Sequence, residues 1–403
     1  MTALNGGEPA PRNRGAVTAE ELVALARGPQ SDIRFSDPAS AATTLLSELL
    51  CRAQLIGSPQ VPVVVRFELT ADGRRHGFDV KWGPEGGAIT GEEPGEPDAL
   101  VRQDLAELLA MTHGPAASAP ATREIHFPEE PGPATHRAGA GWVVRRRAAT
   151  VAVQALTKAS SPTRLDLDEL AVRFGTDKWG GHWFTPHYAR HFAPYRDRPV
   201  TILEIGIGGY DVPTAGGESL RMWKHYFHRG LVCGIDYFDK SALAEPRIRT
   251  FQGDQSDPVF LAEVLAEIGR PDIVIDDGSH LSDHVLTSFR ELYPRLAPGG
   301  LYVIEDIQTS YWSGWNGGRK GLHDPGTTAG FLKSLVDGLH HAEQETPRPA
   351  GHLSITDHTV TGLHVYHNVA FIEKGVNREQ GAASWIRKDV NPMDATSAAK
   401  GQR

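Results

Sequence analysis

The chain has 403 residues, of which 40% are hydrophobic and 23% are charged, and its formal net charge is −9. This length is more than one hydrophobic core usually supports, so two domains are expected. The acidic balance argues against a protein that binds duplex nucleic acid, and no apolar stretch has the length of a membrane span.

The N-terminal segment 1–16 is rich in Gly, Pro, Asn and Arg and lacks the apolar run of a signal peptide. We therefore expect a disordered tail and a cytoplasmic location. Cys51 and Cys233 lie far apart, each in an apolar stretch. This spacing favours two reduced, buried thiols over a disulfide or a metal site.

Residues 17–155 are expected to form an α+β domain. Helical periodicity, a capping residue and a turn between two β-branched runs indicate its elements. We expect helices starting after Thr18 and spanning 41–53, 99–111 and 142–157, and a hairpin of 63–69 with 76–82. This half contains no cluster of acids, no glycine loop and no nucleophile beside a base, which suggests a role in scaffolding or assembly.

Residues 156–403 show a different pattern, in which short apolar segments alternate with amphipathic helical segments. Such alternation predicts an α/β domain with a doubly wound parallel sheet. Residues 362–374 indicate two further strands with an antiparallel edge. The expected strands are 200–205, 231–236, 248–254, 272–276 and 301–306, and the expected helices are 218–228, 257–268 and 282–296.

The first strand of this sheet ends in a glycine turn at Glu204–Gly209. Gly206 and Gly208 fit the start of the dinucleotide fingerprint, but the third position is not glycine and no helix opens directly on the turn. A pyrophosphate ligand is therefore not expected. The next strand ends in Asp236, and this combination suits a ligand with a ribose and no phosphate, such as S-adenosylmethionine (SAM). A glycine pair by itself is more often a structural turn, but acids at several strand ends favour a ligand site.

Two later strands end in carboxylates, Asp277 on one and Glu305 with Asp306 on the other. If the strands are neighbours, their ends lie about 5 Å apart, and a hard cation such as Mg²⁺ or Mn²⁺ would relieve the repulsion. His280 follows closely, at the start of a helix that Ser282 is expected to cap, and its imidazole could accept a proton. The alternative is an ordinary turn and loop cap at these positions.

Two segments, 176–191 and 311–318, are dense in aromatic, glycine or histidine residues. They suit contact with a sugar or a macrocycle, although ordinary loop packing is equally consistent. The candidates for substrate contact are Trp179, His182, Tyr311 and Trp312. His187 and His191 have the spacing of zinc ligands, but no Glu intervenes and no third ligand is apparent. We therefore expect a simple helix over 186–192.

Four motifs together resemble those of the metal-dependent SAM O-methyltransferases of antibiotic sugars. They are Phe-Gly-Thr-Asp-Lys-Trp at 174–179, Leu-Glu-Ile-Gly-Ile-Gly-Gly at 203–209, Asp-Asp-Gly-Ser-His at 276–280 and Ile-Glu-Asp at 304–306. The resemblance covers about 166–374. It implies a class I, Rossmann-like methyltransferase domain, and the upstream region resembles an auxiliary domain that helps to form a homotetramer.

The resemblance also implies roles for individual residues. Asp277, Glu305 and Asp306 would hold Mg²⁺, and His280 would be the general base. The implied SAM site consists of Glu204, Gly206, Gly208, Ser219, Asp236, Asp254, Gln255 and Asp276. The acceptor would be a hydroxyl of a deoxysugar on a macrolide or related polyketide antibiotic.

Two other hypotheses stay open. A metal-assisted hydrolase could use the same acids to activate water, but it leaves the glycine turn and Asp236 unexplained. A non-catalytic, SAM-binding assembly subunit would suit the N-terminal half, but the intact set of acids with His280 argues against it.

Overall fold

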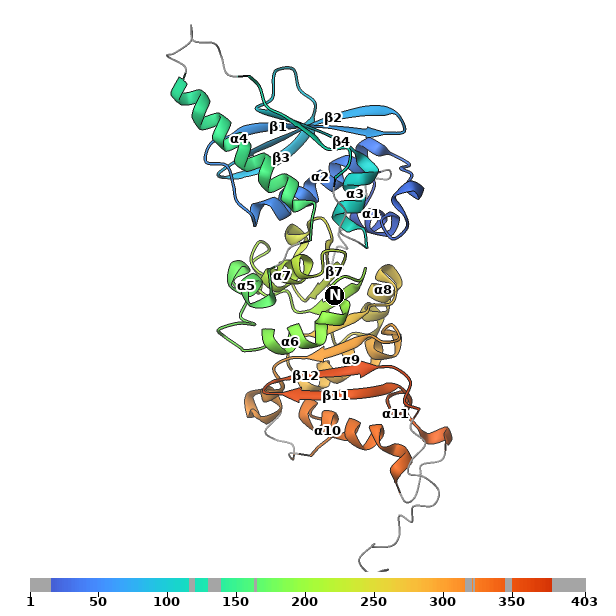
Figure 1. Cartoon of the computed structure of the whole chain (residues 1–403). Helices are drawn as coiled ribbons and strands as arrows, with labels where there is room; N and C mark the ends of the chain where they lie inside the picture. The colour runs from blue at the N-terminus through green and yellow to red at the C-terminus, as the bar shows by residue number, and fades with distance from the viewer. Residues whose placement is uncertain are drawn as a thin grey trace, which may run out of the picture.

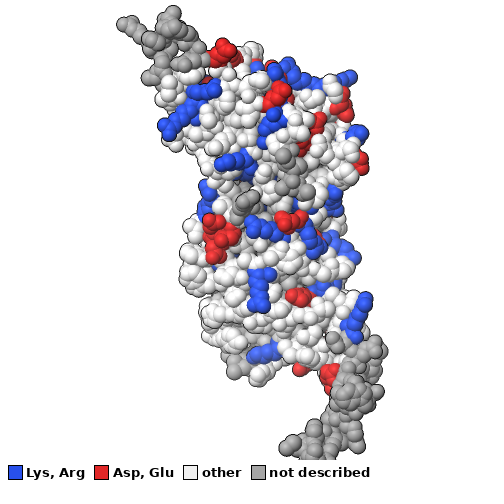
Figure 2. Space-filling view, viewed as in Figure 1, with Lys and Arg blue, Asp and Glu red and all other residues white. Residues whose placement is uncertain are grey.

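A computed structural model describes residues 16–115, 120–129, 139–162, 165–315, 321, 323–344 and 350–378. Figure 1 shows two lobes stacked along a long axis, each built around its own sheet. The expected tail over 1–16 lies outside the described residues except for Ala16. In the described part, no helix combines the length and the apolar composition that a bilayer span requires. On the face shown in Figure 2, basic and acidic side chains are interspersed over both lobes.

The first lobe contains a sheet with the strand order β3-β2-β1-β4-β5. Its elements are α1 (Ala19–Leu25), α2 (Pro38–Gln54), β1 (Val63–Ala71), β2 (Arg74–Gly83), β3 (Gly86–Gly91), β4 (Ala99–Asp104), α3 (Leu105–His113), β5 (Glu124–His126) and α4 (Gly139–Ala159). The expected hairpin is confirmed, since β1 and β2 pair antiparallel around Asp72 and Gly73, both with positive φ. Thr18 forms a capping box with Glu21, as a cap of the first helix should.

The expected helix over 99–111 is wrong in its first half. Residues 99–104 form β4, which pairs parallel to β1 with Ala99 opposite Val65. The helix begins only at Leu105, where the Asp104 side chain accepts a hydrogen bond from the backbone of Glu107. Alternate residues of β4 are buried, and this short period of two is easily mistaken for helical periodicity when a helix follows directly.

The second lobe contains a sheet with the strand order β11-β12-β10-β9-β6-β7-β8. Its strands are β6 (Thr201–Ile205), β7 (Leu231–Asp236), β8 (Ile248–Gln252), β9 (Ile273–Asp276), β10 (Leu301–Ile304), β11 (Val360–Tyr366) and β12 (Val369–Lys374). Its helices are α5 (Leu167–Phe174), α6 (Thr185–Phe192), α7 (Glu218–Tyr226), α8 (Pro258–Ile268), α9 (Ser282–Leu292), α10 (Thr328–Leu339) and α11 (Ile355–Thr359). The five strands β6 to β10 are all parallel, and β12 runs antiparallel to β10. The predicted doubly wound sheet with an antiparallel edge is therefore confirmed.

Each face of this sheet is covered by helices, as Figure 1 shows. Ile202 belongs to the core that includes residues of α5, α6 and α7, whereas its neighbour Leu203 belongs to the core that includes residues of α8, α9 and α10. The two neighbours belong to different cores because successive strand residues point to opposite faces of the sheet. The carboxyl ends of the parallel strands therefore share one open edge, where ligands bind in such sheets.

Cys233 is buried as expected, but Cys51 is only half-buried, and both thiols are free. Cys51 lies near the end of α2, which packs the first lobe against the second.

The two lobes are joined by buried charges. Glu48 of α2 accepts hydrogen bonds from Arg247 at 2.6 Å and from Arg52 at 2.7 Å, and Lys224 of α7 lies 3.4 Å from its other oxygen. Arg52 also donates to the backbone oxygen of His228 at 2.9 Å. Because these side chains are buried, the contacts fix α2 against α7 and against the segment that leads into β8.

Candidate functional site

A cavity of about 720 Å³ opens at the carboxyl ends of the parallel strands. It is lined by the loops that follow β6, β7, β8, β9 and β10, and by the segment between α5 and α6. The predicted site residues in its wall are Gly206, Gly208, Ser219, Asp236, Asp254, Gln255, Asp277, His280 and Asp306. Glu204, Asp276 and Glu305 lie directly behind this wall and are at most 4% exposed.

The glycine turn forms one side of the cavity. Gly206 has a φ of +93°, and a Cβ there would lie 2.1 Å from the backbone oxygen of Asp277. Only glycine tolerates both conditions. The loop after β6 is thereby held against the loop after β9, so the glycine turn and the acid at residue 277 share one site.

Glu204 anchors the turn from behind. Its Oε2 accepts hydrogen bonds from Ser219 Oγ at 2.9 Å and from Trp223 Nε1 at 3.1 Å. Its Oε1 has no hydrogen-bond partner among the described residues, and Lys178 Nζ lies 3.6 Å away. Burial raises the pKa of Glu204 to about 7. A cationic ligand group nearby would favour its ionised form.

Asp236 is held in a fixed orientation at the end of β7. One carboxylate oxygen accepts from the backbone N–H of Ile207 and the other from that of Phe238, each at 2.9 Å. Its carboxylate lies in the cavity wall beside Tyr237, which is 67% exposed. The position matches an acid that receives hydroxyl groups of a ligand.

Gln255 is held by residues on both sides. Its amide donates to Asp276 at 3.1 Å and its oxygen accepts from the backbone N–H of Ser279 at 2.6 Å. Asp276 is 1% exposed and also accepts from Ser288. Asp254 lines the cavity next to Gln255 and accepts from Ser256 at 2.8 Å. Asp276 therefore holds Gln255 in place but does not line the cavity itself.

Asp277, His280 and Asp306 form the acidic end of the cavity. One ligand atom from each lies within 4.8 Å of the others, and His280 Nε2 is 3.4 Å from Asp306 Oδ2. His280 and Asp306 both have left-handed backbones, with φ of +57° and +51°. Such strain is concentrated at functional sites. Two carboxylates beside an open cavity fit a small divalent cation that keeps positions for other ligands, and the imidazole of His280 lies next to them.

Glu305, the third acid predicted at this centre, has a different environment. Its Oε1 accepts from Lys178 Nζ at 2.8 Å and from the hydroxyl of Tyr188 in α6. Lys178 also donates to Asp277 at 2.7 Å. Burial and the nearby Asp277 carboxylate raise the pKa of Glu305. Glu305 is thus connected to Asp277 through the lysine.

Lys178 is a residue of this site that the sequence pattern does not mark as functional, as are Tyr188 and Trp223. It is 1% exposed and lies between three carboxylates, those of Asp277, Glu305 and Glu204. Burial alone would lower its pKa, but the three carboxylates outweigh burial and raise it well above 10.5. Its position within a motif at 174–179 was the available signal. A lysine in a loop gives no periodicity that would mark it as buried.

The aromatic loops approach the acidic end from two directions. His182 Nε2 lies 3.6 Å from Asp306 Oδ1, and its ring stacks on Phe184. From the other side, the ring of Trp315 lies 5.9 Å from that of His280. The remaining substrate candidates are exposed by 38% to 51%, namely Trp179, Tyr311 and Trp312.

Helix α9 begins differently from the expectation. Ser282 is its first residue and not its cap, because the capping position is Leu281 and carries no side-chain hydrogen bond to the helix. The Ser282 hydroxyl instead accepts from the backbone N–H of Thr328 at 3.1 Å, at the start of α10. The helix also ends at Leu292, four residues early, where a 3₁₀ turn containing Pro294 begins.

Comparisons with known proteins agree with this architecture. Residues 19–123 match the family described as MycE methyltransferase N-terminal. The chain is 40% identical over 393 residues to mycinamicin VI 2''-O-methyltransferase of Micromonospora griseorubida, across 94% of this chain and 96% of that protein. It is 48% identical over 310 residues to 8-demethyl-8-alpha-L-rhamnosyl tetracenomycin-C 2'-O-methyltransferase of Streptomyces olivaceus, across 76% of this chain and 79% of the relative.

A solved structure extends the agreement to the whole fold. The MycE methyltransferase from the mycinamycin biosynthetic pathway, in complex with Mg, SAH and mycinamycin VI, superposes with a TM-score of 0.81 at 39% identity. The match covers 94% of this chain and 98% of that one, so it includes both lobes. The predicted class I methyltransferase fold with an N-terminal α+β domain is confirmed. The chain therefore belongs to the family of antibiotic-sugar O-methyltransferases.

Proposed function

We propose that this chain transfers the methyl group of SAM, with the help of Mg²⁺, to a hydroxyl of a deoxysugar on a macrolide or related polyketide. One observation carries the proposal: a single cavity joins the glycine turn and Asp236 to Asp277, His280 and Asp306. Methyl transfer requires the sulfonium methyl and the acceptor hydroxyl to lie close together. In this cavity, the wall suited to a nucleoside, with the glycine turn and Asp236, lies next to the acidic wall with Asp277 and Asp306.

The SAM site would use the wall built on β6, β7 and β8. Ser219 and the buried Glu204 behind it would hold the methionine end, because Glu204 Oε1 is an acceptor suited to a cationic amino group. Asp236 would accept hydrogen bonds from the ribose hydroxyls. Asp254 and Gln255 would border the adenosyl part, with Asp276 holding Gln255 in place.

Asp277 and Asp306 would hold Mg²⁺, with Glu305 behind them and connected through Lys178. When bound, the cation supplies positive charge that stabilises an acceptor oxygen as it loses its proton. His280, whose Nε2 lies 3.4 Å from Asp306 Oδ2, would accept that proton. The oxygen forms its bond to the methyl carbon while the carbon–sulfur bond breaks, and the uncharged thioether leaves.

The acceptor would lie between the two aromatic loops. Three exposed rings and a histidine near Asp306 suit a sugar, whose apolar face packs on rings while its hydroxyls make hydrogen bonds. We assign Trp179, His182, Tyr311 and Trp312 to this contact. Which sugar and which hydroxyl react would then depend on the shape of these loops.

We further propose that residues 17–155 form an assembly domain, that 156–403 form the methyltransferase domain, and that the chain is a homotetramer. The hydrophobic core of the first lobe is separate from the two cores of the second lobe, which supports the division, although the first core extends to Ala159. Helix α4 exposes Val143 and Val144 by 54% and 50%, which suits a contact between chains. Light scattering after size exclusion should give the mass of four chains, and the mass of one chain would contradict the proposal.

The activity can be tested in two steps. Calorimetry should show SAM binding, and methyl transfer to a pool of demethylated macrolides or rhamnosylated acceptors should stop with EDTA and return with Mg²⁺. Absence of SAM binding would overturn the proposal. His280→Ala should retain SAM and Mg²⁺ binding but lose at least about 10²-fold in turnover. His358→Ala, in α11, is the control, and near-normal turnover of His280→Ala would remove His280 as the base.

A further inference from the structure

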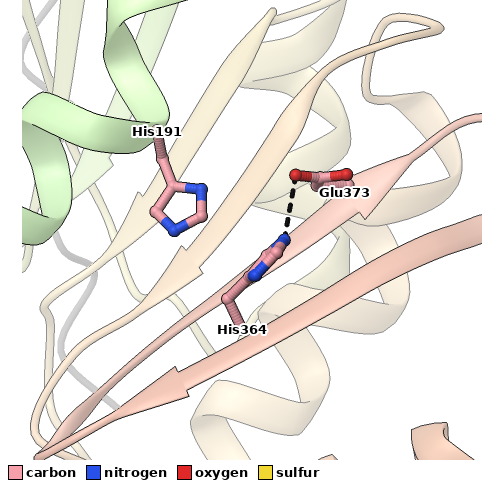
Figure 3. Close-up of side chains that lie close together, drawn as sticks. All are labelled: His191, His364 and Glu373. Carbon is pink, nitrogen blue, oxygen red and sulfur yellow. Dashed lines mark hydrogen bonds and ion pairs between the residues drawn. The ribbon is translucent and has the colours of Figure 1, made fainter.

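A second cluster of possible metal ligands lies outside the cavity. His191 of α6, His364 of β11 and Glu373 of β12 each bring one ligand atom to within 4.8 Å of the others. Figure 3 shows the three side chains directed toward a common gap between the helix and the hairpin. None of them lines the cavity that holds Asp277 and Asp306.

Two of the three side chains, His364 and Glu373, project from the same face of the β11–β12 hairpin. His364 pairs with Phe371, and Glu373 is two residues further along β12, so both side chains lie on one face of the hairpin. His364 Nε2 is 3.0 Å from Glu373 Oε1. The ring of His191 stacks on Phe371 of the same face, with ring centres 4.3 Å apart. A helix and a hairpin that are distant in sequence thus converge on one point.

The orientation of His191 is fixed by a neighbouring hydroxyl. Its Nε2 is 3.0 Å from the hydroxyl of Tyr366, which leaves Nδ1 as the atom for an ion. Ligating histidines in metal sites usually have such a partner on the second nitrogen. His187, one turn earlier, stacks on Tyr366 with ring centres 3.8 Å apart. The two histidines with zinc-like spacing therefore provide one ligand and one support.

The exposure of the three groups suits reversible binding. His191 is 9% exposed, whereas the side chains of His364 and Glu373 are 39% and 45% exposed. Donor atoms around a tetrahedral zinc ion lie about 3.3 Å apart. The half-exposed side chains on the hairpin can make the small rotations needed to reach this spacing.

We propose that His191, His364 and Glu373 form a binding site for a transition-metal ion of the zinc class. Two imidazoles and one carboxylate match known His₂Glu sets, with a fourth position left for water. Mg²⁺ prefers oxygen ligands alone, so it would occupy the cavity acids and not this cluster. The ion would tie α6 to the edge hairpin, and α6 also carries Tyr188, which contacts Glu305.

The test uses the full chain, freed of metal with EDTA, dialysed and kept in excess Mg²⁺. Zn²⁺ titrated by calorimetry should bind one ion per chain, and Co²⁺ should give the visible absorption bands of a tetrahedral site with nitrogen ligands. His364→Ala and Glu373→Gln alter half-exposed side chains and should each weaken binding by at least about 100-fold. Tyr366→Phe removes only the orienting hydroxyl and should weaken binding by about tenfold.

Two matched variants locate the ion. His367→Ala, in the turn of the same hairpin, and Asp277→Asn, in the cavity, should both bind Zn²⁺ like the parent chain. The proposal is overturned if the parent chain binds no Zn²⁺ in excess Mg²⁺. It is also overturned if binding survives both His364→Ala and Glu373→Gln, or is lost in Asp277→Asn. Circular dichroism confirms that each variant is folded.

Discussion

Two buried charge clusters in this protein have opposite composition. Between the lobes, one carboxylate is surrounded by three cations, namely Glu48 by Arg52, Lys224 and Arg247. Behind the cavity, one cation is surrounded by three carboxylates, namely Lys178 by Glu204, Asp277 and Glu305. Burying charged groups costs desolvation free energy, so the surplus charge of each cluster must be balanced by other interactions.

The surplus is compensated in different ways. Between the lobes, Arg247 donates to the backbone oxygens of Lys224, Phe227 and Gly230, so that the protein itself satisfies its guanidinium. Burial would raise the pKa of Glu48, but the surrounding cations outweigh it and hold the pKa well below 4.5. Behind the cavity, burial raises the pKa of Glu204 to about 7. The protein's own groups thus complete the cluster around Glu48, which has a structural role and which we call the joint. The acidic surplus around Lys178 lies next to a cavity and is suited to bound cations.

The largest effect is expected from the joint. Glu48→Gln keeps the side-chain volume but removes the carboxylate that the buried Arg52 and Arg247 share, and it leaves Lys224 with Glu245 alone. The free energy of unfolding should fall by about 3–5 kcal/mol. Urea unfolding followed by circular dichroism measures this. The control is Glu291→Gln, which removes a surface partner of Arg295 and should change stability by less than about 1 kcal/mol. Equal effects of the two variants would contradict the assignment of Glu48 as a structural joint.

A smaller loss of stability is expected from the site cluster. Lys178→Met removes the single cation, but Glu204 and Glu305 can take up protons, so the loss should be about 1–3 kcal/mol. The remaining acids should then depend more on a bound cation. Thermal unfolding should therefore show that Mg²⁺ raises the midpoint of Lys178→Met more than that of the parent chain. A loss as large as that of Glu48→Gln, with no added response to Mg²⁺, would be inconsistent with this view.

The two clusters should affect the pH dependence of stability in opposite directions. Burial lowers the pKa of His228, beside the joint, to about 3, so the unfolded chain binds more protons below about pH 6.5 and stability falls as pH falls. Glu204, with its pKa raised to about 7, binds its proton first in the folded chain, so its contribution grows as pH falls from 7 to about 4.5.

Each group contributes at most about 1.4 kcal/mol per pH unit within its window. Urea unfolding should be measured between about pH 7 and pH 5. Relative to the parent chain, the free energy of unfolding should fall less steeply with falling pH in His228→Asn and more steeply in Glu204→Gln. Equal slopes in the parent chain and both variants would mean that neither group has the assigned shift.

The second lobe was easier to predict than the first. Its buried parallel strands are apolar runs bounded by acids or glycine, and each is followed by a helix, so strand and helix signals do not overlap. In the first lobe, β4 runs directly into α3 and the two were predicted as one helix. The short β3 and β5 were not predicted. β3 is half glycine and β5 has three residues, so neither has the apolar alternation of a strand.

Local pattern alone was enough to place the acids, the glycine turn and His280 at the ends of strands, because those positions follow from chain order and the parallel sheet. Only the folded chain brings Lys178 between its carboxylates, and only there does His191 meet His364 and Glu373. The contacts of Lys178 with Asp277 and Glu305, and of His191 with the hairpin, join segments about 100 to 180 residues apart in sequence. They depend on how α6 and the loop before it pack against the sheet, and the packing of distant elements leaves no periodic signal in the chain.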